Sequence, residues 1–183
     1  HEHVPGKHAK RDKEAQPEFP TAEVSHDEWQ QAERSGIDHR ERKAQVMALT
    51  EGTEWIDRGA NVLLFGPPGV GKSHLVSALG HALIDAGRRV LFTRCSDLVQ
   101  RLQAARRDLR LPQELAKLDR FDLLILDDLS YVRRDQAETS VLFELISERY
   151  ERKSLAITAN TPFSQWGEVF VEPAMTLAAV DRL

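Results

Sequence analysis

A glycine-rich stretch holds the residues best suited to chemistry in this chain. It fills the pattern G-x-x-x-x-G-K-[ST] with Gly66, Gly71, Lys72 and Ser73, between an apolar run and an amphipathic segment. Glycines let backbone N–H groups turn inward around a polyphosphate, while the lysine can reach the β- and γ-phosphates and the serine can ligate Mg²⁺. The pattern therefore predicts binding of ATP with Mg²⁺ by residues 66–74, namely Gly66, Pro67, Pro68, Gly69, Val70, Gly71, Lys72, Ser73 and His74. The alternative is a strand-to-helix turn that binds nothing.

Two carboxylates form the second chemical element. Asp127 and Asp128 directly follow four apolar residues, 123–126, in the run 121–126, which is typical of a strand buried on both faces. Open α/β sheets bind ligands at the carboxyl ends of their strands. We expect Asp127 to serve the same Mg²⁺ as Ser73, through water, and Asp128 to accept a hydrogen bond from the water that attacks the γ-phosphate. A turn or a helix cap is the structural alternative for this pair.

Asn160 is the third candidate, because it directly follows the apolar run 155–159. A carboxamide at a strand end can donate to a γ-phosphate and accept from the attacking water. It could therefore sense whether the terminal phosphate is present. Capping of the following helix is the alternative, although Thr161 is better placed for that role.

The elements that would position these residues alternate along the chain. We expect strands at 62–65, 89–93, 121–126 and 155–159, and helices after the loop to Gly87, at 97–108 with Ser96 as its cap, at 112–118, around 141–150 and from Thr161 onward. Such alternation predicts an α/β fold in which helices cover both faces of a parallel sheet.

The chain before the first strand divides into two parts. Residues 1–37 are polar, and we expect them to be partly disordered, with one short helix over 26–36. Residues 38–183 would form the ATP-binding domain. It would start with a helix that runs from Asp38 to Arg58 and packs on the domain edge, although Gly52 and Thr53 could interrupt it.

Composition excludes several classes of protein. No apolar run approaches the roughly 20 residues that span a membrane, and the polar N-terminus has no signal-peptide core. We expect a cytoplasmic protein that has no membrane partner. Cys95 is the only cysteine of the sequence, so it forms neither a disulfide framework nor a thiolate metal cluster. We expect it to be buried and inert.

Positive charge concentrates in residues 88–110, where seven arginines stand against two aspartates, although the chain as a whole has a net charge of −4. Such a patch suits an anionic polymer. The spacing of Arg101, Arg106 and Arg107 can bring them to one side of the helix. We predict that they contact DNA phosphates rather than bases, with a merely solvated face as the alternative.

From Gly59 onward the sequence closely resembles the IstB-type transposition helper ATPases, which belong with the DnaC-like helicase loaders in the AAA+ class. The resemblance is carried by GPPGVGKSHL at 66–75, RVLFTRCSDLVQRLQAARRD at 89–108, LLILDDLSY at 123–131, FELISERYERKS at 143–154 and ITANTPFSQWGEVF at 157–170. The terminal residues 179–183 look like the start of the arginine-bearing helix of the family.

The resemblance implies the P-loop fold of the AAA+ class and an ATPase that assembles as a homo-oligomer on DNA and assists a transposase. It places Lys72 and Ser73 in the Walker A motif, Asp127 and Asp128 in Walker B, and Asn160 at sensor 1. By the same resemblance, Arg182 is the arginine finger, which completes ATP sites at subunit interfaces. The C-terminal continuation of the family is absent from the sequence, so we expect domain 38–183 to be truncated.

Three other functions stay open. A DnaC-like helicase loader would share the ATP chemistry but would bind a replicative helicase. A small-molecule kinase would share the phosphate loop but would phosphorylate an acceptor. A truncated ATP-binding switch would bind nucleotide without hydrolysing it. For Arg182, the alternative is an ion pair with Asp181 or Glu172.

Overall fold

The computed structural model describes residues 39–129, 135–161, 166 and 173–183, with side chains from residue 44 onward. The segment 1–37 and the helix expected over 26–36 lie outside the described residues. So does the helix start expected directly after Thr161. None of the described helices is long and apolar enough to cross a lipid bilayer.

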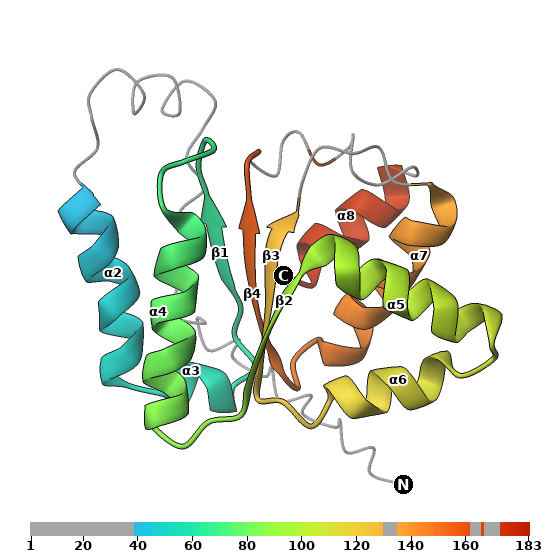
Figure 1. Ribbon diagram of the computed structural model, residues 1–183, viewed down its shortest axis with the longest axis horizontal. Helices are drawn as coiled ribbons and strands as arrows, with labels where there is room; N and C mark the ends of the chain where they lie inside the picture. Colours follow the sequence, from blue (N-terminus) through green and yellow to red (C-terminus); the bar gives the residue numbers. More distant parts are fainter. Residues whose placement is uncertain (1–38, 130–134, 162–165, 167–172) are drawn as a thin grey trace, which may run out of the picture.

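Four parallel strands form the centre of the molecule (Figure 1). They are β1 (Val62–Phe65), β2 (Val90–Arg94), β3 (Leu123–Leu129) and β4 (Ser154–Ala159), in the spatial order β1-β4-β3-β2. All neighbouring pairs are parallel. β3 and β4 are central and consist almost entirely of buried residues, as expected for a parallel sheet that is covered on both faces.

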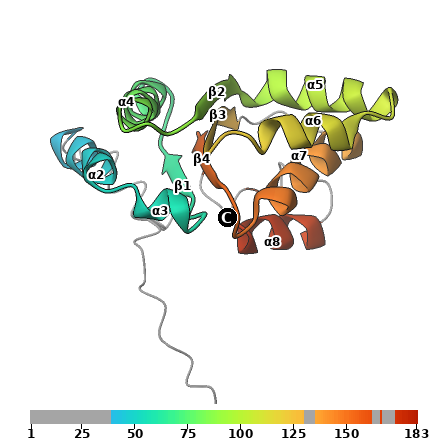
Figure 2. The same ribbon diagram turned by 90° about the horizontal axis from the view of Figure 1, so that it is seen from below.

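One face of the sheet is covered by α4 (Lys72–Asp85), which directly follows the glycine-rich loop, and by α2 (His39–Glu51) and α3 (Glu54–Asp57) around it (Figure 2). Val76, Leu79 and Leu83 of α4 are fully buried against Ile125 and Ala156 of the central strands. Since α4 begins immediately after the loop, this packing fixes the loop relative to the strand ends.

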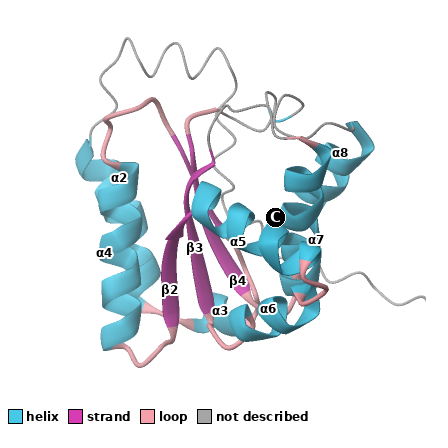
Figure 3. Cartoon of the chain, turned by 45° about the vertical axis from the view of Figure 1, so that its right-hand side comes forward, coloured by secondary structure: helices cyan, strands magenta, loops and turns pink. Residues whose placement is uncertain are grey.

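The other face is covered by α5 (Cys95–Arg107), α6 (Leu111–Leu118), α7 (Gln136–Arg149) and α8 (Pro173–Asp181). Figure 3 shows the strands between the two groups of helices. Leu102, Leu118 and Leu142 meet Leu124 and Trp166 in the larger of the two hydrophobic cores. Cys95 is buried here, as expected. The layered α/β architecture predicted from the sequence is thus confirmed.

β3 contains a bulge. Leu126 lies opposite Ile157 and Leu129 lies opposite Ala159 on β4. Two residues of β3, the paired aspartates, therefore face the single residue Thr158. An insertion of this kind bends a strand and redirects its side chains, and it is uncommon between parallel strands. β3 consequently continues through both aspartates, where we expected the strand to end before them.

Several expected helices have different boundaries, and α7 begins at Gln136, before the expected residue 141. The helix expected from Asp38 to Arg58 is two helices, because α2 ends at Glu51 and α3 begins at Glu54. The break falls at the glycine and threonine that we expected could interrupt it. α5 begins at Cys95 rather than after Ser96, whose hydroxyl bonds the Asp97 carboxylate and caps no backbone group of the helix.

Candidate nucleotide-binding site

The glycine-rich loop connects the end of β1 to the start of α4. Gly69 and Gly71 have φ angles of 84° and 86°, in the left-handed region that residues with a Cβ rarely adopt. Gly71 is also the N-cap of α4, which has no side-chain cap. The first N–H groups of the helix, with its positive dipole end, can therefore serve an anion. This is the backbone geometry that phosphate binding requires.

Lys72 points back across the loop. Its ammonium donates to the carbonyl oxygens of Gly66 at 2.5 Å and Pro67 at 3.0 Å, and to Oδ1 of Asn160 at 2.7 Å. Burial lowers the pKa of this ammonium, against the opposing effect of the nearby Asp128 and Asp127 charges. A partly buried cation at the mouth of a phosphate loop is suited to a polyphosphate.

Asp127 and Ser73 come together from β3 and α4. The Ser73 hydroxyl donates to Oδ1 of Asp127 at 2.9 Å, and the same oxygen accepts a bond of 2.7 Å from the Thr158 hydroxyl. Asp127 is buried. The structure thus brings together the two residues that the sequence assigned to one ion.

These oxygens fit Mg²⁺. The ion prefers oxygen ligands and is commonly held by one or two carboxylates together with substrate phosphates. Ser73 and Asp127 provide a hydroxyl and a carboxylate beside the phosphate loop. Among the described residues, no group of three or more His, Cys, Asp or Glu side chains could hold a metal by itself. The donor set therefore fits an ion that arrives with a nucleotide.

Asp128 is exposed and stands next to Asn160. Its φ angle is +59°, which an aspartate tolerates better than most residues. Nδ2 of Asn160 donates to Oδ1 of Asp128 at 3.3 Å, while its Oδ1 accepts from Lys72. Asn160 therefore joins the loop lysine to the second carboxylate. Lys72, Asp128 and Asn160, three expected catalytic residues, lie within one hydrogen-bonded chain.

Arg182 lies elsewhere. Its guanidinium sits over the Phe143 ring of α7, 5.2 Å from the ring centre, and donates to the Ala178 carbonyl at 2.7 Å. Its own carbonyl accepts a bond of 3.4 Å from Asn61, the residue before β1. The described residues include no ion pair between Arg182 and Asp181, and Glu172 lies outside them. Arg182 is thus tied to the start of β1, whereas the phosphate loop follows the end of that strand.

Arg101 and Arg106 of α5 do not share one side of the helix. Arg101 forms a two-point ion pair with Glu114 of α6, at 3.0 and 2.7 Å. Arg106 bonds Glu144 of α7 at 2.6 Å. The two arginines lie five positions apart, which places them about 140° apart around the helix axis, so the expectation of a common basic side is wrong for this pair. Arg107 is exposed. The DNA contact itself stays a prediction.

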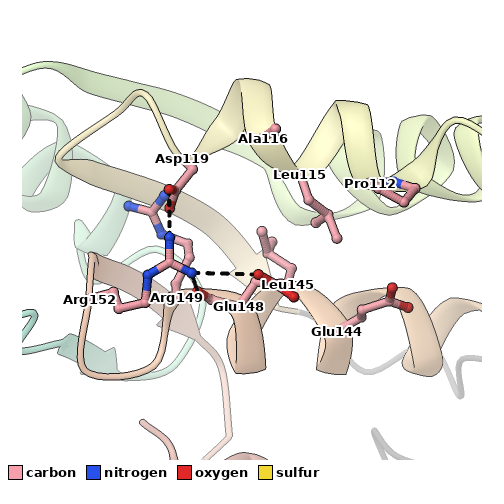
Figure 4. Close-up of a pocket in the computed structure, with 9 residues that line it drawn as sticks. All are labelled: Pro112, Leu115, Ala116, Asp119, Glu144, Leu145, Glu148, Arg149 and Arg152. Atoms are coloured by element: carbon pink, nitrogen blue, oxygen red, sulfur yellow. Dashed lines mark hydrogen bonds and ion pairs between the residues drawn. The ribbon is translucent and has the colours of Figure 1, made fainter.

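A separate hollow of about 260 Å³ lies between α6 and α7 (Figure 4). Leu115 and Leu145 supply part of its apolar lining. Arg152 bridges Asp119 and Glu148 at one end, as the dashed lines in Figure 4 show. None of its lining residues belongs to the phosphate loop or the Asp127–Asp128 pair, so it is not part of the nucleotide site.

Two functional polar residues are not predicted from the sequence. Thr158 belongs to the expected apolar strand next to the site, although a polar residue in a fully buried strand is itself a signal. Asn61 lies at the other end of the sheet, directly before β1, and no motif marks it. Its side chain accepts from the Leu155 amide at 2.8 Å and donates to the Leu183 carbonyl at 3.2 Å, so it links β4 to the residues that follow α8.

Comparison with known proteins decides the family. Residues 15–183 match the family model described as IstB-like ATP binding protein of IS21. The chain belongs to this family. It is 70% identical over 141 residues to a putative insertion sequence ATP-binding protein of Sinorhizobium fredii, covering 77% of this chain and 47% of that protein. It is 40% identical over 148 residues to the IS21 putative ATP-binding protein of Pseudomonas aeruginosa, covering 81% and 54%. The chain thus spans about half the length of these IstB relatives.

Solved structures agree on the fold of this IstB-family chain. The crystal structure of the DnaC helicase loader superposes with a TM-score of 0.66 at 22% identity, over 76% of this chain and 83% of that one. AMPPCP-bound DnaA from Aquifex aeolicus gives a TM-score of 0.66 at 18% identity, over 80% and 45%. At such identities the likeness concerns the fold, which is the P-loop fold of AAA+ proteins, as predicted.

Proposed function

We propose that this chain binds ATP with Mg²⁺ and hydrolyses it. The observation that carries the proposal is the hydrogen-bonded set of Lys72, Asn160 and Asp128 at the mouth of the phosphate loop. It combines a cation for phosphate, an amide that can face a terminal phosphate and a carboxylate that can accept a proton. Membership of an ATP-binding family supports the same proposal.

Each residue has a distinct task. Lys72 exchanges its two loop carbonyls for β- and γ-phosphate oxygens, and the backbone N–H groups of the loop cradle the rest. Asn160 turns its amide toward the γ-phosphate and the water, and the Asp128 carboxylate accepts a hydrogen bond from that water. Ser73 and Asp127 would hold the Mg²⁺ ion, which neutralises phosphate charge when bound.

Arg182 acts on ATP bound by a neighbouring subunit of a homo-oligomer. Its main chain is tied to Asn61 at the start of β1, while its own phosphate loop begins after the end of that strand. A side chain held near the start of β1 is badly placed to reach the γ-phosphate of ATP bound in the same subunit. Arginine suits the task because its planar fork stabilises charge spread over several phosphate oxygens. Hydrolysis would then depend on assembly.

The biological role we propose is assistance to a transposase on DNA. The named relatives are ATP-binding proteins of insertion sequences, which supports this partner. DNA would be held mainly through its phosphates. A helicase loader is the second candidate function, and the likeness to the DnaC helicase loader is the observation that supports it. Pull-down with the transposase of the same element and with a replicative helicase separates them, since capture of the helicase alone would contradict the transposition role.

ATP turnover with and without DNA tests the chemistry. We expect release of phosphate from ATP in the presence of Mg²⁺, faster when DNA is added. Transfer of the phosphoryl group to a small acceptor instead of water would favour a kinase. Tight ATP binding with no turnover under assembling conditions would leave a nucleotide-dependent switch and would contradict hydrolysis.

A further inference from the structure

The bulge in β3 separates side chains that face opposite sides of the sheet. Side chains alternate between the faces of a strand, so Ile125 and Asp127 share the face that α4 covers, where Ile125 is buried. In an unbulged strand that kept both aspartates, the same alternation would place Leu129 on that face as well. It is instead buried in the core on the α7 side. The bulge thus accommodates the second aspartate, while Asp127 stays on the α4 side and Leu129 stays in the opposite core.

One hydroxyl contacts both residues of the bulge. Thr158 is 1% exposed. Its Oγ1 donates to Oδ1 of Asp127 at 2.7 Å and accepts the backbone N–H of Asp128 at 2.8 Å. A bulge interrupts the regular ladder of backbone bonds, and here a side chain satisfies the freed N–H. The same oxygen orients the carboxylate that meets Ser73.

We propose that Thr158 is a positioning residue for ATP hydrolysis: its hydroxyl fixes the direction of the Asp127 carboxylate and the left-handed conformation of Asp128. This inference rests on the proposed function and deepens it. Because Thr158 Oγ1 contacts both residues, it fixes the position of the Asp127 carboxylate, which would face Mg²⁺, relative to that of Asp128, which would face the water. Thr158 itself is buried behind both and acts through them.

Loss of the hydroxyl has two separate consequences. The Asp128 N–H loses its acceptor, so the residue is released from a φ of +59° that most residues avoid. Asp127 keeps the bond from Ser73 but loses the donor that sets its rotation. Residues that orient metal ligands commonly change metal affinity or activity by about 10–100-fold when mutated.

The first measurement uses the protein without nucleotide and follows hydrogen exchange of the Asp128 amide. Thr158→Val removes the hydroxyl at nearly constant shape, and Thr158→Ser keeps it. We expect exchange about tenfold faster or more in the valine variant and near the parent rate in the serine variant, because the bonded amide is protected until it opens. Thr139→Val is the matched control, since it removes another buried hydroxyl, in α7.

The second measurement is the Mg²⁺ dependence. The Mg²⁺ concentration for half-maximal turnover should rise about tenfold or more in Thr158→Val and stay near the parent value in Thr158→Ser and Thr139→Val. Nucleotide affinity measured without Mg²⁺ should be unchanged. If the valine variant does not fold, Thr158→Ala against Thr158→Ser gives the same comparison, because the two differ only by the oxygen atom.

Equal amide exchange in Thr158→Val and the parent would overturn the inference, as would an unchanged Mg²⁺ dependence in a folded valine variant. Loss of activity with an unaltered Mg²⁺ requirement would mean that Thr158 only stabilises the sheet, and would also overturn it. A parent protein that fails to hydrolyse ATP would contradict the proposed function. The exchange measurement would still decide whether Thr158 holds the two aspartates.

Discussion

The Lys72 ammonium and the Asn160 amide oxygen lie 2.7 Å apart, although they come from different elements, α4 and the end of β4. The lysine is thus held by protein oxygens at the position where phosphate oxygens would arrive. Nucleotide binding must exchange these contacts for phosphate contacts. Asn160 bonds both Lys72 and Asp128. A change in the contacts of the lysine on nucleotide binding is therefore expected to alter the hydrogen bonding of Asp128, the carboxylate expected to bind water.

Replacing the lysine should abolish tight ATP binding. Lys72→Ala is expected to weaken ATP affinity about tenfold or more, since a hydrogen bond to a charged group contributes about 1.5–3 kcal/mol and 1.4 kcal/mol corresponds to a factor of ten. Titration with a fluorescent ATP analogue measures it. Lys117→Ala, on the exposed side of α6, is the control and should bind normally. Equal affinity in both variants would contradict the site.

Asp128→Asn should separate binding from turnover. The amide keeps the shape of the side chain but is a poor proton acceptor, so nucleotide affinity should stay within about twofold while turnover falls about 100-fold or more. Binding and phosphate release are measured on the same preparation. Asp85→Asn, at the exposed end of α4, controls for the loss of a carboxylate. Turnover at the parent rate would require another residue to orient the water.

DNA binding should depend on Arg107 and on salt. Arg107→Gln is expected to weaken binding to duplexes of any sequence and to reduce the slope of log affinity against log salt by about 1, as for one lost phosphate contact. ATP affinity of the monomer should not change. A triple substitution that included Arg101 and Arg106 would also break their ion pairs with Glu114 and Glu144. The single variant avoids this structural change. Salt-insensitive, sequence-selective binding would refute the phosphate contact.

Mixing variants tests whether Arg182 acts between subunits. Arg182→Ala subunits keep an intact ATP site, and Lys72→Ala subunits keep the arginine. Each should be nearly inactive alone, and a mixture should regain turnover at interfaces that combine a good site with a good arginine. Normal hydrolysis by Arg182→Ala alone under assembling conditions, or no recovery in any mixture, would exclude the trans role.

Asp122 should make stability depend on pH. Hydrogen bonds from the Arg89 side chain, its backbone N–H and Lys153 hold the pKa of the Asp122 carboxyl well below its ordinary value, against the effect of burial. A carboxylate with a lowered pKa stabilises the fold above its unfolded pKa of about 3.9, and this stabilisation is lost as the pH falls further. Asp122→Asn should therefore cost about 1 kcal/mol at pH 7.

Urea unfolding at pH 7, 5 and 3 measures this difference. It should be similar at pH 7 and 5 and smaller at pH 3. Asp57→Asn is the control, because its ion pair with Arg88 is open to solvent and such pairs contribute little. If the free energy of unfolding lost in Asp122→Asn stays the same at pH 3, the charge of Asp122 is not the cause of that loss.

Local sequence was enough to predict the strands, the phosphate loop and the three strand-end residues, because glycine, aspartate and asparagine have distinctive chemistry at fixed positions. It was insufficient where distant side chains decide. The partners of Arg101 and Arg106 come from two other helices. The bulge depends on the register between β3 and β4, and that register is what brings the Thr158 hydroxyl into contact with both aspartates.

The bulge also marks where this chain can vary in length. If one aspartate were deleted, the other would pair regularly with Thr158, and Leu129 would keep its place opposite Ala159 and its side of the sheet. The core would therefore survive, and the loss would be one carboxylate together with the left-handed backbone of Asp128. In a genetic sense, a single-codon deletion at this point acts like a substitution, because it damages the site and spares the core.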